Sequence, residues 1–193
     1  MLRLNRDKTE LLVIGPKHKV NPPVKGIHVA GEYIEVSSNA RNKGVIFDAH
    51  VNLEKHVIKT CKTAFYHLRN ISKIRNCLSQ DNAETLVHAF ISSKLDFFNA
   101  LLYGLHRSVI DRLQYVHNCA TRLVTRTRSS EHITPVLRRL HWLPVRQRIT
   151  YKILLLTYKA LNGMPPKKYI ADLLQHYTPT RQLRSSAKNL LVT

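Results

Sequence analysis

The spacing of apolar residues changes near residue 50, and this change constrains the fold more than any other feature of the sequence. Before it, apolar residues form short runs at residues 11–14, 26–29, 33–36 and 45–47, separated by glycine, proline and polar residues. Such runs are typical of short strands. After it, apolar residues recur every three or four positions, as in amphipathic helices. The sequence therefore predicts a mainly α chain, in which a small antiparallel β patch precedes a helical bundle (α+β overall).

The predicted β patch is too small to be stable by itself. Three or four short strands bury little apolar surface unless a second layer covers one face. We therefore expect residues 1–50 to be the edge of a sheet whose remainder lies outside this chain. Residues 51–177 are expected to form the helical domain and to fold more stably, and residues 178–193 are expected to form a basic tail.

Three helices can be placed in the first half of the helical region. An apolar stripe predicts a long first helix, and its members are Val57, Ile58, Cys61, Ala64, Phe65, Leu68 and Ile71. Asp81 and Glu84 resemble a capping box that opens a second helix, which is expected to break near residues 94–96. A third helix turns its apolar residues inward between positions 113 and 124. Tyr115 is then on its outer face, where it either stacks on a base or packs against a neighbour.

Further helices are predicted towards the C-terminus. Thr134 is expected to cap a short helix, with Pro135 at its first position. Trp142 ends that helix and is expected to anchor itself in the core. Residues 145–161 are apolar on most sides, which predicts a buried central helix. A last short helix is expected over residues 165–177.

The chain carries a large positive charge that is spread along its length. It has 31 Lys and Arg residues against 12 Asp and Glu residues, a net charge of +19. Between residues 122 and 152, eight basic residues stand against one acid, Glu131. A solvated surface ordinarily mixes both signs, so an unmixed basic face favours phosphate binding. The residues predicted to bind nucleic acid, on outer helix faces, are Arg122, Arg126, Arg148, Lys152 and Lys159.

No combination of residues predicts a catalytic site. The chain has no adjacent acidic pair that would hold two catalytic metal ions, and residues 15–19 match neither a P-loop nor a dinucleotide-binding fingerprint. Cys61, Cys77 and Cys119 lack the spacing of a zinc site or a disulfide framework, so we expect reduced thiols and no metal site. We expect a nuclear or cytoplasmic protein without a membrane span, because there is no apolar run of 18 residues and no signal peptide.

Five stretches of sequence, taken in order, extend from residue 2 to residue 186 of the chain. They are LRLNRDKTELLVIGPKH (2–18), GVIFDAHVNLEKHV (44–57), DNAETLVHAFISSKLDFFNALLYGL (81–105), LQYVHNCATRLVTRTRSSEHITPVLRRLHWLPVRQRITYKILLLTYKALNG (113–163) and RQLRSS (181–186). In this order they resemble the C-terminal part of the reverse transcriptases of LINE-type, non-LTR retrotransposons of vertebrates. So long an ordered set makes the resemblance specific.

The resemblance implies a late palm element, a thumb and a connector of an RNA-directed DNA polymerase. Lys8 would lie near the nucleotide phosphates, and Gly44, Val45, Ile46 and Phe47 would form a primer-grip-like hairpin. In the family, the metal-binding aspartates, the fingers, most of the palm and the endonuclease precede the LNRDKTE element. We therefore expect a truncated fragment with no catalytic residue and no cofactor of its own, whereas the full-length family uses magnesium.

The sequence thus predicts a nucleic-acid-gripping fragment of a retrotransposon reverse transcriptase. Its expected partners are RNA, DNA or an RNA–DNA hybrid, held through phosphate contacts. Two alternatives remain, a non-enzymatic basic helical module that binds nucleic acid and a helical protein-interaction domain. The unmixed basic stretches favour nucleic acid over protein, and the salt dependence of RNA binding separates the two.

Overall fold

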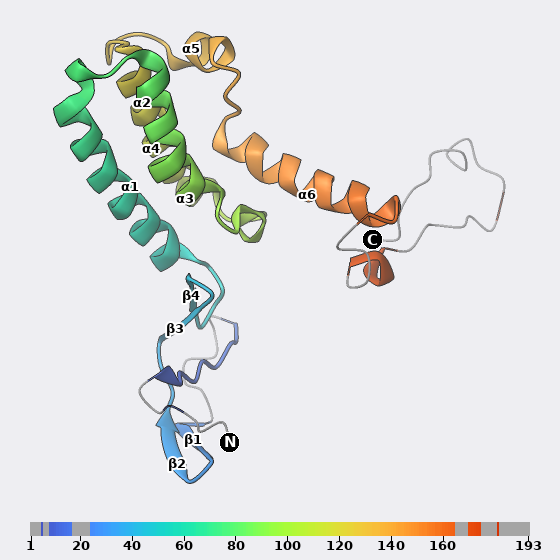
Figure 1. Cartoon of the computed structure of the whole chain (residues 1–193). Coiled ribbons are helices and arrows are strands. Elements are labelled where there is room, and N and C mark those ends of the chain that lie inside the picture. Colours follow the sequence, from blue (N-terminus) through green and yellow to red (C-terminus); the bar gives the residue numbers. More distant parts are fainter. Residues whose placement is uncertain (1–4, 6–7, 17–23, 165–169, 175–180, 182–193) are drawn as a thin grey trace.

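The computed structural model describes residues 5, 8–16, 24–164, 170–174 and 181, and it arranges them in three parts (Figure 1). Two β hairpins lie at the N-terminal end, a helical bundle follows, and the long helix α6 (Val145–Leu161) extends away from the bundle. The chain is therefore mainly helical with a small antiparallel β portion, as the spacing of its apolar residues predicts. Within the described residues, no helix is both long and apolar enough to cross a bilayer.

The β portion consists of two separate antiparallel hairpins. The paired strands are β1 (Gly26–Val29) with β2 (Glu32–Glu35), and β3 (Asn39–Asn42) with β4 (Val45–Asp48). Lys43 and Gly44, which join β3 to β4, both have positive φ, of 45° and 90°. Two consecutive residues with positive φ make the tight turn whose twist matches that of the flanking strands. The predicted antiparallel pairing is confirmed, although it forms two two-stranded sheets in place of one patch.

The predicted strand over residues 11–14 does not form. Leu11 alone makes a bridge, a parallel one with Val36, and the N–H of Ser37 donates to its carbonyl at 2.8 Å. Because β2 ends at Glu35, the backbone beyond it offers a partner to only one residue of this run. The segment is held at its far end by Gly15, whose N–H donates to the carbonyl of Ala49 at 3.0 Å.

The bundle contains three long helical stretches. They are α1 (Glu54–Ile74), the stretch from α2 (Gln80–Val87) through the π-helical segment η3 (His88–Ser92) to α3 (Ser93–Asp96), and α4 (Arg107–Thr125). The second stretch breaks at Phe97, close to the predicted position, because Phe97 is extended and Phe98 is left-handed. Helix α5 (Ile133–Arg139) packs on α4. Short 3-10 turns lie at η2 (Arg75–Cys77), η4 (Asn99–Leu102) and η5 (Ala171–Leu173).

One hydrophobic core joins these helices and extends into the second hairpin. Helix α1 buries Val57, Ala64, Leu68 and Ile71, and α4 buries Val109, Ile110, Leu113, Val116, Ala120 and Val124. Val45 of β4 and Leu53 belong to the same core, so the core crosses residue 50. The domain limits predicted at residues 50 and 177 stay predictions, and the limit at residue 177 and the basic tail beyond it lie outside the described residues, except for Arg181.

A buried carboxylate fixes the second hairpin to the start of α1. Asp48 is only 7% exposed, and its Oδ1 accepts from the N–H groups of His50 and Asn52 at 3.0 and 3.1 Å. Its Oδ2 accepts from the N–H of Leu53 at 2.9 Å. These three bonds satisfy backbone donors in the sharp bend before α1, where Val51 and Leu53 both have positive φ.

Two predicted helix starts are wrong. Ser79 caps α2, its hydroxyl accepting from the N–H of Asn82, so Asp81 and Glu84 do not form a capping box. Helix α5 begins after His132, which places Thr134 and Pro135 inside its first turn. In both places a suitable capping sequence stands within two residues of the real start. The sequence near a helix start does not determine which residue becomes the N-cap when a residue just before it can also accept from the first N–H groups of the helix.

The prediction that residues 145–161 form a buried central helix is also wrong. Only Val145, Ile149 and Ala160 of α6 are buried, whereas Tyr151, Leu154 and Tyr158 are 57%, 62% and 58% exposed. The beginning of α6 packs on α3, α4 and η4, and the helix then continues past the bundle (Figure 1). Apolar residues on most sides of a helix predict burial only if other layers surround it. The bundle covers the beginning of α6, and in the second half of the helix Ala160 alone is buried.

The remaining structural predictions concern the thiols and the C-terminal helix. Cys61, Cys77 and Cys119 are free thiols, as predicted. The helix predicted over residues 165–177 lies largely outside the described residues, which include a single 3-10 turn, η5, in this region.

Candidate nucleic-acid interface

Exposed basic side chains line one face of α1. They are Lys55, Lys59, Lys62, Arg69 and Lys73, which we call the α1 stripe. Successive members are 4, 3, 7 and 4 residues apart, the spacing that keeps side chains on a single face of a helix. The face lies opposite the buried residues of α1, and exposed Tyr66 stands in its middle. At 1.5 Å per residue the α1 stripe runs for roughly 27 Å.

Most of the cations in the α1 stripe are available to a ligand. Lys55 is hydrogen-bonded to Asn39, but Lys59, Lys62, Arg69 and Lys73 make no side-chain hydrogen bond or ion pair with any other described residue. The one acid of α1 is Glu54, at its first position. Unpaired ammonium and guanidinium groups along one face attract a polyanion and release its counterions on binding.

The α1 stripe borders a basic pocket beside the second hairpin, which we call the hairpin pocket. It has a volume of about 410 Å³, and the described residues that line it include no carboxylate. Its lining residues are Arg41, Gly44, His56, Lys59, Thr60, Thr63, Ser93, Lys94 and Phe97. Burial, and then the charge of Lys59, lowers the pKa of His56, so at neutral pH this imidazole contributes hydrogen bonds and not charge.

The residues predicted by resemblance lie around this second hairpin. Lys8 is exposed on the N-terminal segment. That segment contacts β3, because the N–H of Arg41 donates to Glu10 at 2.6 Å. In the hairpin itself Val45 is buried in the core and Phe47 packs against it. Gly44 closes the turn, where a Cβ atom would lie 3.2 Å from the ring of Phe97. Of the predicted primer-grip-like residues, Gly44 therefore lines the hairpin pocket, whereas Val45 and Phe47 belong to the core and Ile46 is half-buried.

Arg122 and Arg126 occupy the end of α4 and are partly engaged with backbone. The guanidinium of Arg122 donates to the carbonyl of Arg128 and, at 2.9 Å, to that of Glu131. Arg126 has φ of 56° and ends the helix, and its guanidinium donates to the carbonyl of Arg75 at 3.3 Å. Arg122 is half-buried because the chain folds back over it after α4, a reversal that helical periodicity does not predict.

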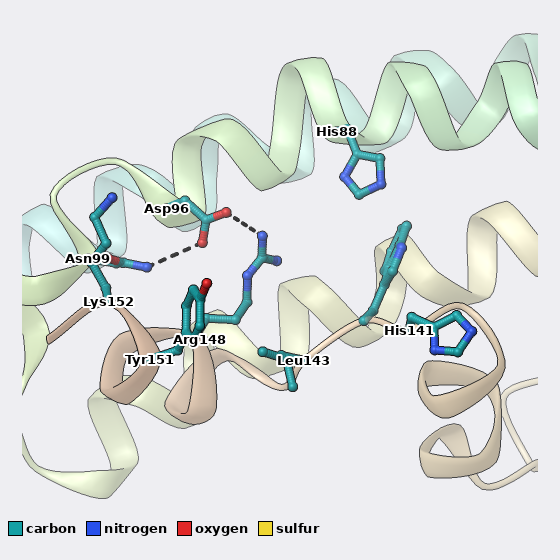
Figure 2. Close-up of a pocket in the computed structure, with 9 residues that line it drawn as sticks. His88, Asp96, Asn99, His141, Leu143, Arg148, Tyr151 and Lys152 are labelled. Carbon is teal, nitrogen blue, oxygen red and sulfur yellow. Dashed lines mark hydrogen bonds and ion pairs between the residues drawn. The ribbon is translucent and has the colours of Figure 1, made fainter. Parts of the chain in front are cut away.

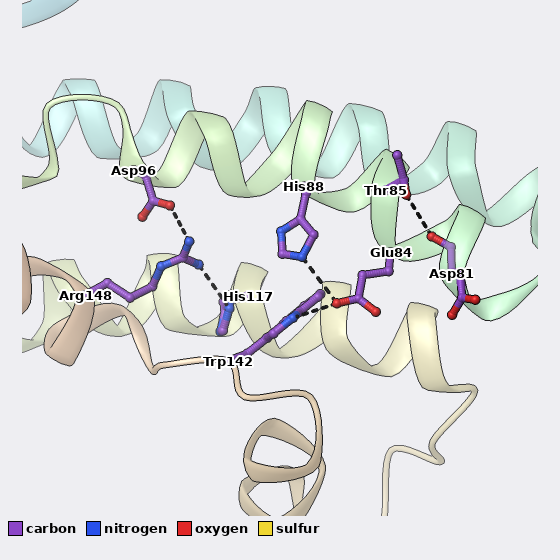
Figure 3. Close-up of polar contacts among 8 residues, drawn as sticks. All are labelled: Asp81, Glu84, Thr85, His88, Asp96, His117, Trp142 and Arg148. Carbon is purple, nitrogen blue, oxygen red and sulfur yellow. Dashed lines mark hydrogen bonds and ion pairs between the residues drawn. The ribbon is translucent and has the colours of Figure 1, made fainter.

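Arg148 does not lie on an outer face, contrary to the prediction from the sequence. Its side chain is 21% exposed, and its Nη2 is paired with the carboxylate of Asp96 (Figure 2). Its Nη1 lies 3.4 Å from Nε2 of His117 (Figure 3). The beginning of α6 packs on α3 and α4. Arg148 therefore faces these two helices, although helical periodicity within α6 predicts it on the surface.

Lys152 and Lys159 complete the predicted set. Lys152 is exposed and lines the same pocket as Arg148, together with Tyr151 and Trp142 (Figure 2). Lys159 is half-buried in the last turn of α6. The five predicted residues are therefore divided between the end of α4 and the length of α6, and they do not form one face. Sequence reasoning missed the α1 stripe, although its regular spacing is readable in the sequence.

A polar network holds α6 and the turn before it against the bundle. Trp142 is 9% exposed, which confirms it as a core anchor, and its Nε1 donates to Glu84 at 3.1 Å (Figure 3). His88 lies 3.4 Å from the same carboxylate. His117 is 1% exposed, and burial, Arg148 and His88 together lower its pKa to about 4. The network is therefore built around a neutral histidine. It holds α6 and the turn before it against the bundle, and it does not offer a free positive charge to a ligand.

No group of three or more His, Cys, Asp and Glu side chains gathers within the described part of the chain. No family model, curated protein or solved structure matches the sequence.

Proposed function

We propose that this chain is a nucleic-acid-gripping fragment of an RNA-directed DNA polymerase, the reverse transcriptase of a LINE-type retrotransposon. It holds RNA, DNA or an RNA–DNA hybrid through phosphate contacts, and it contributes no catalytic residue. The resemblance of five ordered stretches between residues 2 and 186 supports the family. Its place of action is then the nucleus or the cytoplasm.

The observation that carries the binding function is the α1 stripe. Five basic side chains stand on one solvent-facing side of a single helix, and acidic residues do not interrupt them. A rigid helix holds these charges in a line of roughly 27 Å, close to eight base steps of a duplex strand. The hairpin pocket adds Arg41 and Lys94 at one end of this line. The interface is then one surface of α1 and the second hairpin.

Binding of a fluorescently labelled RNA–DNA hybrid, measured by anisotropy at several salt concentrations, tests this proposal. Each phosphate neutralised contributes about −0.9 to the slope of log K against log salt. A variant with Lys59, Lys62, Arg69 and Lys73 all changed to Ala should lose roughly 3.6 units of slope if each residue neutralises one phosphate. Base preference should not change, because phosphate contacts carry no sequence information.

A matched variant separates a local interface from net charge. Lys25, Arg138, Arg139 and Arg146 are exposed cations outside α1, and changing all four to Ala removes the same charge. This control should keep most of the slope of the wild type. Equal losses in the two variants would show that only total charge matters, and an absence of salt-dependent binding would refute the proposed function.

A protein-interaction module is the second candidate, and α6 favours it. Its exposed apolar side chains Tyr151, Leu154, Tyr158 and Leu161 recur at three- and four-residue steps, which places them on one face. Such a face on a helix that extends beyond its bundle is typical of a contact surface. If this face binds a protein, changing Leu154 and Tyr158 to Ser should alter the sedimentation of the complex that contains this chain. The same change should leave its affinity for the RNA–DNA hybrid unchanged.

A further inference from the structure

A groove between α1 and α4 combines an apolar floor with a basic rim. Its volume is about 870 Å³. The floor contains Ile58, Phe65 and Tyr115, and the rings of Phe65 and Tyr115 contact each other with centroids 5.9 Å apart at 50°. Tyr115 is 62% exposed, so one face of its ring is open to a ligand. Burial raises the pKa of the Cys61 thiol, which keeps this part of the lining neutral.

The rim of the groove is positive after its own ion pairs are taken into account. Lys62 and Arg69 line it and belong to the α1 stripe. Arg112 also lines it and lies 3.6 Å from Glu54, while Asp111 lies 3.7 Å from Arg107. The two acids near the groove thus have basic partners. Lys62 and Arg69 make no ion pair with a described residue, so the surplus charge lies along the α1 side.

We propose that this groove binds the unpaired bases of a single-stranded nucleic acid. The proposal rests on the nucleic-acid-binding function above and names the class of ligand. A strand whose phosphates follow Lys62 and Arg69 of the α1 stripe directs its bases sideways into the groove. There a base stacks on the open face of Tyr115, with Phe65 behind that ring.

The chemistry of the groove favours single strands over the other classes of partner. In a duplex the bases are already stacked and paired, so a duplex presents mainly phosphates and leaves the apolar floor uncovered. An acidic polymer without bases likewise contacts only the basic rim and leaves the apolar floor uncovered. A second copy of this chain is disfavoured, because the exposed face of α6 is bordered by Lys152 and Lys159 and would bring like charges together.

Anisotropy titrations with Tyr115→Ala test the proposal. Three probes are compared, a labelled uridine 12-mer, a blunt RNA duplex of the same length and heparin. Loss of one stacked base should weaken binding of the single strand roughly tenfold, which corresponds to about 1.4 kcal/mol, and should change duplex and heparin binding less than twofold. Tyr115→Phe keeps the ring and should bind the single strand like the wild type. Tyr103→Ala removes a tyrosine of similar exposure, 64%, elsewhere on the bundle and serves as the matched control.

Photocrosslinking locates the bases independently of affinity. A uridine 12-mer that contains 4-thiouridine should crosslink to peptides that carry Phe65 or Tyr115. The inference is overturned if Tyr115→Ala weakens all three probes equally, or if crosslinks map elsewhere. It is also overturned if the variant changes sedimentation and not affinity, because the groove would then be a protein contact. In these cases salt-dependent binding through the α1 stripe still supports the proposed function. If the wild type binds none of the three probes, both the proposed function and the role of the groove are refuted. The midpoint of thermal unfolding of each variant is compared with that of the wild type to check that the variant folds.

Discussion

Protonation of His117 should weaken the fold as pH falls. His117 is almost fully buried on α4, and its Nε2 lies 3.4 Å from the guanidinium of Arg148. Its ring also contacts that of Trp142 in a tilted arrangement, with centroids 5.5 Å apart. A proton on this imidazole would place a second positive charge beside Arg148 in a dry site. The native state therefore resists protonation more strongly than the unfolded chain does.

The sign and size of the effect follow from the two pKa values of His117. Its pKa is 6.5 in the unfolded chain and about 4 in the folded protein. Between these values the unfolded state binds more protons, so stability rises with pH in this range and is lost as pH falls below about 6.5. One such group costs roughly 2 kcal/mol between pH 7 and pH 4.5. His56, whose pKa is also lowered, adds a smaller loss of the same sign.

Urea unfolding at several pH values measures this loss. In His117→Gln the amide oxygen can still accept from Arg148, but the titrating group is gone. Its free energy of unfolding should fall by roughly 2 kcal/mol less than that of the wild type between pH 7 and pH 4.5. His132→Gln, at an exposed position, controls for the loss of an imidazole as such. If His117→Gln and the wild type have parallel pH profiles, the buried neutral histidine is not the cause.

Two further changes probe the packing of the bundle. Arg75 is 8% exposed, and its guanidinium donates to three backbone carbonyls at 2.6–2.8 Å, two of them at the end of α4. Arg75→Met leaves these carbonyls without a donor and should lower the free energy of unfolding, measured in urea, by about 2–4 kcal/mol. Arg75→Lys should have an intermediate effect. Equal stability of the methionine variant and the wild type would contradict this capping role. Gly44→Ala should lower the midpoint of thermal unfolding, because φ is +90° and the new methyl group meets Phe97, at a cost of about 1–2 kcal/mol. Gly31→Ala has nearly the same φ but open space around it, so it should have the smaller effect.

The sequence alone determined the local elements of the chain. The β-branched runs on either side of Gly31 predicted β1 and β2, and the run after Gly44 predicted β4, because each run stands next to a glycine that allows a tight turn. Strand β3 has no such run, so the spacing did not predict it. Recurrence every three or four positions predicted α1 and α4 and most of their buried residues, although Ile58 of the predicted stripe is exposed. The excess of basic residues is likewise a property of the sequence, and so is the spacing of the α1 stripe, which periodicity places opposite the core.

Tertiary structure decided which charged residues are free to bind a partner. Arg122 and Arg148 carry the same signal in the sequence as Lys62 and Arg69, but one closes a loop and the other pairs with Asp96. Glu84 resembles a capping residue and instead accepts from Trp142, which lies 58 positions away. Tyr115 was predicted on the outer face of its helix, where it is exposed, but only the packing of α1 on α4 places its ring against Phe65.

The exposure of α6 has the same origin. Its apolar composition predicted burial, but burial depends on how many neighbours reach each turn, and the bundle reaches only its beginning. Helical periodicity is a local property, since it follows from 3.6 residues per turn within one segment. Ion pairs, folded-back loops and covering layers depend on segments that are distant in sequence, so they are fixed only when the chain packs.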